Sequence, residues 1–300
     1  MNYIFYFKNK FINDIVNLNI ILEKKITSRW IAGPYINNAI LDTKKFNRVK
    51  ITPMINYLGE NVNNLKNIEM NINQYIKLIN EIKKNNLNAN ISVKPTQLGL
   101  LINNKILVKN YLKLISIAEK ANIFVWLDME ESKYIDDIIK LYFKAIENKK
   151  KNIGICIQSY LKRSNNDVKQ ISLKHGIIRL VKGAYKEPNK VAYTSWIEIT
   201  QNYIKLMKYL FIHSNNFMIA THDLNIINKA LKLKKQYKRT VKFAMLKGIK
   251  NKYLIELAKT QIVFVYIPFG TKWFSYSLRR LKEIKNLKLI IKSLFENQNI

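Results

Sequence analysis

The chain has 300 residues, 48% of them hydrophobic, with 52 Lys and Arg against 20 Asp and Glu, a formal net charge of +32. This length suits one large domain or two ordinary ones. No apolar run approaches the ~20 residues of a membrane-spanning helix, and the N-terminus lacks a secretory signal, so we expect a cytoplasmic protein. The lysines are spread along the chain without a basic block, which argues against a nucleic-acid-binding protein and is compatible with peripheral attraction to anionic lipid.

In chain order, residues 1–45 have the pattern of short helices, and residues 46–300 that of one barrel domain with a C-terminal helix, so we expect a single domain over 1–300. The single cysteine, Cys156, excludes an intramolecular disulfide, and its apolar surroundings predict a core residue. Strand-length apolar runs with turn residues at their ends then recur eight times: Val49–Leu58, Ala89–Val93, Ile123–Met129, Ile153–Tyr160, Gly176–Val181, Phe217–Ala220, Val241–Leu246 and Ile262–Ile267.

Longer stretches separate these runs, and in Ile68–Lys84 and Lys105–Lys120 apolar residues return every three or four positions, as in amphipathic helices. Apolar strands that alternate with such helices predict a parallel sheet covered by helices. Eight units predict an α/β fold, a distorted (β/α)8 TIM-type barrel whose active site forms at the carboxyl ends of the strands. An open doubly wound sheet is the alternative, but no Gly-x-Gly-x-x-Gly follows the first run.

Polar residues capable of chemistry collect where the runs end. A single polar residue at the end of a run is ordinary capping. Polar residues at the ends of seven runs, all on one rim of the barrel, predict a functional site. The residues are Glu60, Lys94, Asp128 with Glu130, Gln158, Arg179 with Lys182, Thr221 with His222, and Tyr266.

The run that ends near Arg179 is broken at Gly183, which leaves Arg179, Lys182 and Tyr185 beside free backbone amides. Cations and N–H groups at a strand end suit an anionic ligand or a cofactor diphosphate. The alternative is a turn with ordinary solvated lysines.

Beyond the last run, the spacing of Tyr276, Arg279, Arg280 and Glu283 places them on adjoining faces of a helix. Two guanidiniums there can hold a carboxylate through several charge-assisted hydrogen bonds. The alternative is a solvent-facing Arg–Glu pair of little energetic weight.

Several of these segments, in one order, resemble the motifs of bacterial proline dehydrogenases, the flavin enzymes that oxidise L-proline. The central match is Arg179–Pro188, supported by Ile91–Leu100, Leu127–Glu130 and Arg279–Arg280. The resemblance implies a monofunctional enzyme with FAD that converts L-proline to Δ1-pyrroline-5-carboxylate, the first step of proline degradation to glutamate. It also implies hydride transfer from C5 to flavin N5 and a membrane quinone as electron acceptor.

The resemblance further implies a role for each matching residue. The residues of the catalytic centre are Asp128 and Arg179. Those that contact the substrate are Lys94, Tyr266, Tyr276, Arg279 and Arg280. Those that contact FAD are Met129, Gln158, Lys182, Gly183, Ala184, Thr221 and His222. Gating and supporting roles fall to Glu60 and Glu283.

Two segments depart from the family pattern. Lys242 and Ala244 stand in a strand that usually reads Phe-Glu-Phe-Gln, and Asn56 replaces an acid of the first strand. These changes predict altered flavin affinity or altered hydrogen bonding inside the barrel. The alternative function is therefore a catalytically weakened barrel of the same family that is retained for binding.

Overall fold

The computed structural model describes residues 29–273, and in these residues eight parallel strands close into a barrel in chain order. This confirms the (β/α)8 barrel and excludes the open sheet. The strands are β1 (Thr52–Tyr57), β2 (Asn90–Val93), β3 (Val125–Leu127), β4 (Ile153–Gln158), β5 (Ile178–Val181), β6 (Phe217–Ala220), β7 (Lys242–Leu246) and β8 (Ile262–Phe269).

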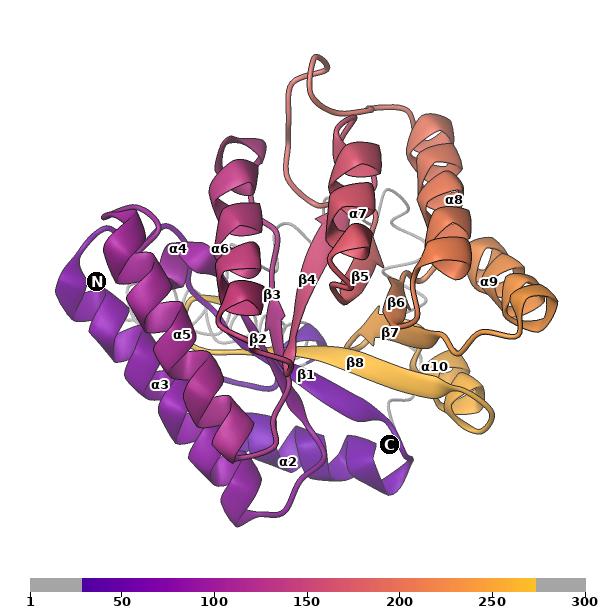
Figure 1. The fold of residues 1–300 in the computed structure, drawn as a ribbon. Coiled ribbons are helices and arrows are strands. Elements are labelled where there is room, and N and C mark those ends of the chain that lie inside the picture. Colours follow the sequence, from indigo (N-terminus) through magenta and orange to yellow (C-terminus); the bar gives the residue numbers. More distant parts are fainter. Residues whose placement is uncertain (1–28, 274–300) are drawn as a thin grey trace, which may run out of the picture.

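Helices surround the sheet on its outer side (Figure 1). In α3 the buried residues Ile68, Ile72, Tyr75 and Ile79 recur at the helical period, and one apolar face therefore packs against the strands. The helical segments are α2 (Ile36–Arg48), α3 (Leu65–Lys84), α4 (Pro95–Leu98), α5 (Asn104–Lys120), the 3-10 turn η1 (Ser132–Tyr134), α6 (Ile135–Glu147), α7 (Ser164–Leu173), α8 (Trp196–His213), α9 (Leu224–Tyr237) and α10 (Asn251–Ala258).

The barrel closes between its first and last strands. The register of this seam runs from Thr52 opposite Phe264 to Tyr57 opposite Phe269. Figure 1 shows the yellow strand β8 beside the indigo strand β1.

The interior of the barrel is apolar at its centre and polar at its carboxyl end. The side chains that fill the centre come from five strands: Met54, Trp126, Met218, Ala244 and Phe264. Because side chains alternate along a strand, the residues two positions further on face the same interior, closer to the carboxyl end. Those residues include Asn56, Asp128 and Tyr266, which explains why the motif residues surround one space.

The segment before β1 is attached to the end of β7. Lys247 lies 3.2 Å from Asp42 of α2 and donates to the carbonyl of Ile31 at 3.0 Å. Helix α2 crosses the expected segment boundary at residue 45. The expected helices before residue 29, and the C-terminal helix with Tyr276, Arg279, Arg280 and Glu283, lie outside the described residues. Within residues 29–273, every helix is too short or too polar to cross a membrane.

Candidate active site

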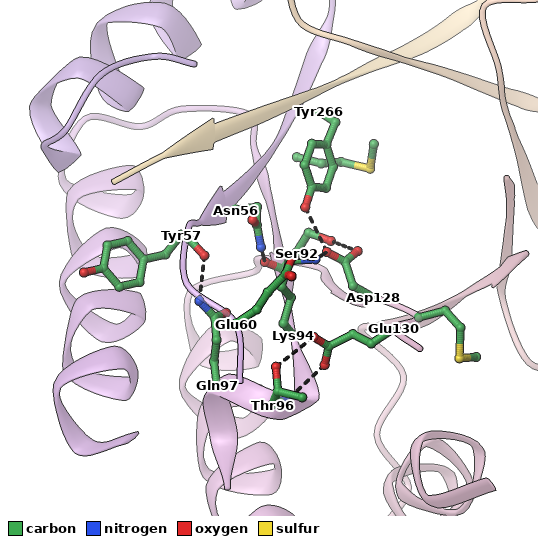
Figure 2. A network of polar contacts seen from close by, with 12 residues as sticks. Asn56, Tyr57, Glu60, Ser92, Lys94, Thr96, Gln97, Asp128, Glu130 and Tyr266 are labelled. Atoms are coloured by element: carbon green, nitrogen blue, oxygen red, sulfur yellow. Dashed lines mark hydrogen bonds and ion pairs between the residues drawn. The ribbon is translucent and has the colours of Figure 1, made fainter. Parts of the chain in front are cut away.

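Asp128, directly after β3, is the centre of a buried polar cluster at the carboxyl end of the barrel (Figure 2). Its Oδ1 accepts a hydrogen bond from Ser92 Oγ at 2.7 Å and forms an ion pair with Arg179. Its Oδ2 accepts from the Tyr266 hydroxyl at 2.8 Å and lies 3.6 Å from Lys94 Nζ. The structure thus brings together residues from β2, β3, β5 and β8 that are far apart in the sequence.

The charges of this cluster are stable at neutral pH. Burial opposes the ionisation of Asp128, but Lys94 and Arg179, with the hydrogen bonds from Ser92 and Tyr266, hold its pKa below the ordinary value. Arg179 also lies over two aromatic rings, 5.3 Å from the centre of Trp126 and 5.6 Å from that of Tyr266. The aromatic faces stabilise the guanidinium in a position where water is excluded.

Glu60 extends the cluster toward the end of β1. Its Oε1 lies 3.3 Å from Lys94 Nζ, so Lys94 stands between Glu60 and Asp128. Burial lowers the pKa of Lys94, yet nearby tyrosines and both carboxylates together raise it well above the ordinary value. The lysine is therefore a permanent cation.

Gln158, at the end of β4, has a buried side-chain amide of which only the nitrogen is hydrogen-bonded. Its amide nitrogen donates to the backbone oxygens of Met129 at 2.9 Å and Glu130 at 3.2 Å. Its amide oxygen is buried and has no hydrogen-bond partner among the described residues. A buried acceptor of this kind is normally satisfied, and an N–H of a bound group would satisfy it.

The turn after β5 packs closely against the ring of Tyr160. Gly183 has φ +115°, and a Cβ there would overlap the ring of Tyr160. Lys182 lies 2.9 Å from Asp223 Oδ2 and 3.3 Å from the centre of the Trp196 ring. Ala184 is exposed. A glycine is required here because a side chain would clash with the Tyr160 ring and strain the backbone at this positive φ.

Thr221 and His222, at the end of β6, contact the neighbouring strand and loop. His222 Nε2 accepts from the backbone N–H of Leu246 at 2.9 Å, and Thr221 Oγ1 accepts from the N–H of Asp223 at 3.1 Å. These contacts fix the loop between β6 and α9, and a flavin contact of either residue stays a prediction.

Several residues of the site were not singled out from the sequence. Ser92 lies two positions before Lys94 and so faces the same side of β2, a signal that strand alternation provides. Trp126 precedes Asp128 by the same spacing. Asp223, the partner of Lys182, directly follows Thr221 and His222 at the end of the sixth run, but its contact with Lys182 was not predicted because it depends on how two loops meet.

The three residues that depart from the family pattern lie at different levels of the barrel. Lys242 is the first residue of β7, at the amino end of the barrel, and its Nζ donates to Asn216 at 2.8 Å. Ala244 belongs to the apolar interior. Asn56 donates to the carbonyl of Ser92 at 2.9 Å. Lys242 thus lies away from the carboxyl-end site, and Asn56 supports β2 beneath it.

The fold and the cluster define a barrel enzyme with a buried, charged site at the carboxyl ends of its strands. A family model described as proline dehydrogenase matches residues 39–288. The chain belongs to the proline dehydrogenase family and is an oxidoreductase of proline catabolism.

Curated relatives agree with this assignment. Proline dehydrogenase 2 of Bacillus subtilis strain 168 is 31% identical over 257 residues, 84% of each chain. Proline dehydrogenase 1 of the same strain is 31% identical over 259 residues, 85% of each chain. Proline dehydrogenase of Deinococcus radiodurans is 28% identical over 280 residues, 90% of each chain.

Solved structures share the fold. Proline utilization A (PutA) from Bdellovibrio bacteriovorus, inactivated by N-propargylglycine, has a TM-score of 0.84 and 22% identity, over 97% of this chain and 35% of that chain. A PutA mutant from Bradyrhizobium japonicum has a TM-score of 0.76 and 18% identity, over 90% of this chain and 32% of that one. The chain therefore spans about a third of the length of these PutA proteins.

Proposed function

We propose that the enzyme uses FAD to oxidise L-proline to Δ1-pyrroline-5-carboxylate, by removal of a hydride from C5. The observation that carries this proposal is the buried cluster at the carboxyl ends of the strands, in which Lys94, Arg179 and Tyr266 all contact Asp128. Family membership supplies the substrate class, and the charges of the cluster suit a zwitterionic amino acid.

The substrate carboxylate is proposed to bind Lys94, with Arg279 and Arg280 as further cations. Tyr266 and Tyr276 would pack against the apolar ring. A carboxylate held by several cations is fixed in orientation as well as in position, so that one carbon of the ring is presented for reaction. The amine must be uncharged before the hydride leaves, and Asp128, held ionised, would then stabilise the positive charge that develops on the nitrogen as the hydride departs.

We propose that FAD is held by residues that follow β3, β4, β5 and β6. They are Met129, Gln158, Lys182, Gly183, Ala184, Thr221 and His222. The unsatisfied oxygen of Gln158 supports this placement. When bound, FAD supplies the redox chemistry as acceptor of the hydride. Arg179 contributes a fixed positive charge, which stabilises negative charge that develops beside it.

A membrane quinone is proposed as the final electron acceptor. The formal net charge of +32 favours contact with anionic lipid, and we propose a cytoplasmic enzyme that meets the inner face of the membrane peripherally.

Anaerobic titration of the purified, yellow protein with L-proline tests the proposal. The flavin absorbance is expected to bleach, and Lys94→Met is expected to raise the proline concentration for half-bleaching by about tenfold or more at unchanged flavin content, because a charge-assisted contact is lost. Lys144→Met, on the exposed face of α6, is the matched control. Bound flavin without bleaching would favour a binding-only barrel, and a colourless protein would contradict the FAD assignment.

A further inference from the structure

Glu130 is a buried acid of the site that the proposed reaction does not use. It is 2% exposed and follows β3 by three residues. Its carboxylate accepts hydrogen bonds from the backbone N–H of Thr96 at 2.9 Å and from the Thr96 hydroxyl at 2.7 Å, as Figure 2 shows. Both donors are uncharged, so these contacts hold the side chain in place without neutralising it.

Glu130 is also one of several carboxylates that lie near Lys94. Glu60 and Asp128 lie 3.3 and 3.6 Å from Lys94 Nζ, and Glu130 is close enough for the charges of Lys94 and Glu60 to act on it. Tyr185 and Tyr266 are the titratable groups that face Lys94 from the loop after β5 and from β8. Arg179 pairs with Asp128 from β5. Among the described residues, three carboxylates thus act on this lysine.

The surroundings permit Glu130 to change its charge near neutral pH. Burial raises the pKa of Glu130 to about 7, although Lys94 and the hydrogen bonds from Thr96 oppose the rise. Asp128 and Lys94 keep their charges in this range, because the pKa of Asp128 is lowered and that of Lys94 is raised. Glu130 is therefore the member of the cluster suited to gain or lose a proton.

Both protonation states fit the same geometry. The Thr96 hydroxyl donates to ionised Glu130, and it accepts at the same time from the backbone N–H of Asn61 at 3.1 Å. A hydroxyl oxygen has two acceptor lone pairs, so it can also accept from a protonated Glu130 while the Thr96 N–H still donates to the other carboxyl oxygen. A proton on Glu130 then changes the charge beside Lys94 without releasing the segment that follows it.

We propose that Glu130 takes up a proton from solvent when the substrate carboxylate binds beside Lys94, and so removes the repulsion between the two anions. The inference rests on the proposed function, in which Lys94 contacts this carboxylate. Glu130 acts through charge and contacts neither the substrate nor the cofactor, so it is a positioning residue. No bond of the substrate changes in this step, and the proton returns to solvent when the carboxylate leaves.

The test measures binding of cyclopentanecarboxylate to the FAD-bound enzyme as a function of pH. This probe has no amine, and its one titratable group is ionised above about pH 6. The dissociation constant of the wild type is expected to rise about tenfold between about pH 6 and pH 8.5. In Glu130→Gln it should stay within about twofold of the low-pH wild-type value. Glu131→Gln, next in the chain and paired with Lys133, should keep the wild-type step.

Calorimetry of the wild type in two buffers of different ionisation enthalpy gives the number of protons taken up when the probe binds at about pH 7.5. This measurement tests the proposal even if Glu130→Gln does not fold. Net uptake supports the proposal. The absence of uptake, or a pH step that persists in Glu130→Gln, overturns it. Failure of the probe to bind at any pH would instead contradict the proposed carboxylate site, and the two failures are thereby distinguished.

Discussion

Two lysine–aspartate pairs lie at the carboxyl ends of the strands, and they differ in an instructive way. Lys94 and Asp128 are separated by 3.6 Å, and Lys182 and Asp223 by 2.9 Å. The shorter pair would be expected to hold its lysine more firmly. Yet the pKa of Lys94 is raised well above the ordinary value, whereas that of Lys182 is lowered.

The difference comes from the number of groups around each lysine that favour its charged form. Burial lowers the pKa of both. For Lys94, tyrosines and two carboxylates, Asp128 and Glu60, more than offset this lowering of the pKa. For Lys182 the opposing effect comes from Asp223. One short ion pair does not offset the loss of water around a partly buried ammonium, while several longer contacts do. The Asp128 cluster is thus a fixed electrostatic site, and Lys182 is a cation that a bound anion could still stabilise.

The largest effect is expected from Asp128→Ala. This change leaves Arg179 and Lys94 buried without their common carboxylate, and removing one partner of such a network costs about 3–5 kcal/mol. Urea unfolding of the purified protein measures the loss. A loss no greater than that of Lys182→Met would contradict the distinction between the two pairs.

The next effect concerns Glu130 and pH. Its pKa in the folded protein is about 7 against an ordinary 4.5, so the folded state binds a proton that the unfolded state lacks, and stability falls as pH rises between these values. A tenfold change in proton affinity corresponds to about 1.4 kcal/mol. The unfolding free energy of Glu130→Gln, relative to the wild type, should therefore increase by about 3 kcal/mol from about pH 4.5 to pH 8. A difference that does not depend on pH would show that Glu130 ionises normally.

A smaller loss is expected from Gly183→Ala. The positive φ and the overlap with the Tyr160 ring should cost about 1–3 kcal/mol in unfolding free energy and reduce the fraction of protein purified with FAD. Asn189→Ser, at an exposed position of the same loop that has no proposed contact with FAD, is the control and should change neither quantity. Full FAD content in Gly183→Ala would contradict the proposed cofactor turn.

The smallest effect is expected from Lys182→Met. The pair with Asp223 is partly exposed, and such pairs contribute at most about 1 kcal/mol. Thermal unfolding measures this, and FAD affinity measured in the same variant sharpens the comparison. Weaker FAD binding at nearly unchanged stability would identify Lys182 as a cation reserved for the cofactor.

Much of the fold could be predicted because each strand is a continuous apolar run. The order of the units and the barrel are confirmed, but the run Ile123–Met129 contains a strand of only three residues, Val125–Leu127. Hydrophobicity marks what is buried, and the residues on both sides of β3 include buried ones, Ile123 and Met129, that lie outside the strand. The position of β6, Phe217–Ala220, agrees because turn residues lie directly at both ends.

The site was predictable only as a set of strand ends. Lys94, Asp128, Arg179 and Tyr266 were expected on one rim because all strands of a parallel barrel end on the same side. The individual contacts between these residues could not be predicted, because they depend on the register of neighbouring strands. The pairing of Val93 with Leu127 brings the end of β2 beside that of β3, where Thr96 meets Glu130.

The seam between β1 and β8 has a consequence for synthesis of the protein. The partner of Tyr57 is Phe269, so more than 200 residues must leave the ribosome before β1 acquires its second neighbour. Until then one edge of β1 carries unpaired backbone groups, which are prone to association with other chains. Slowing translation late in the message should therefore lengthen the period during which nascent chains aggregate or require a chaperone.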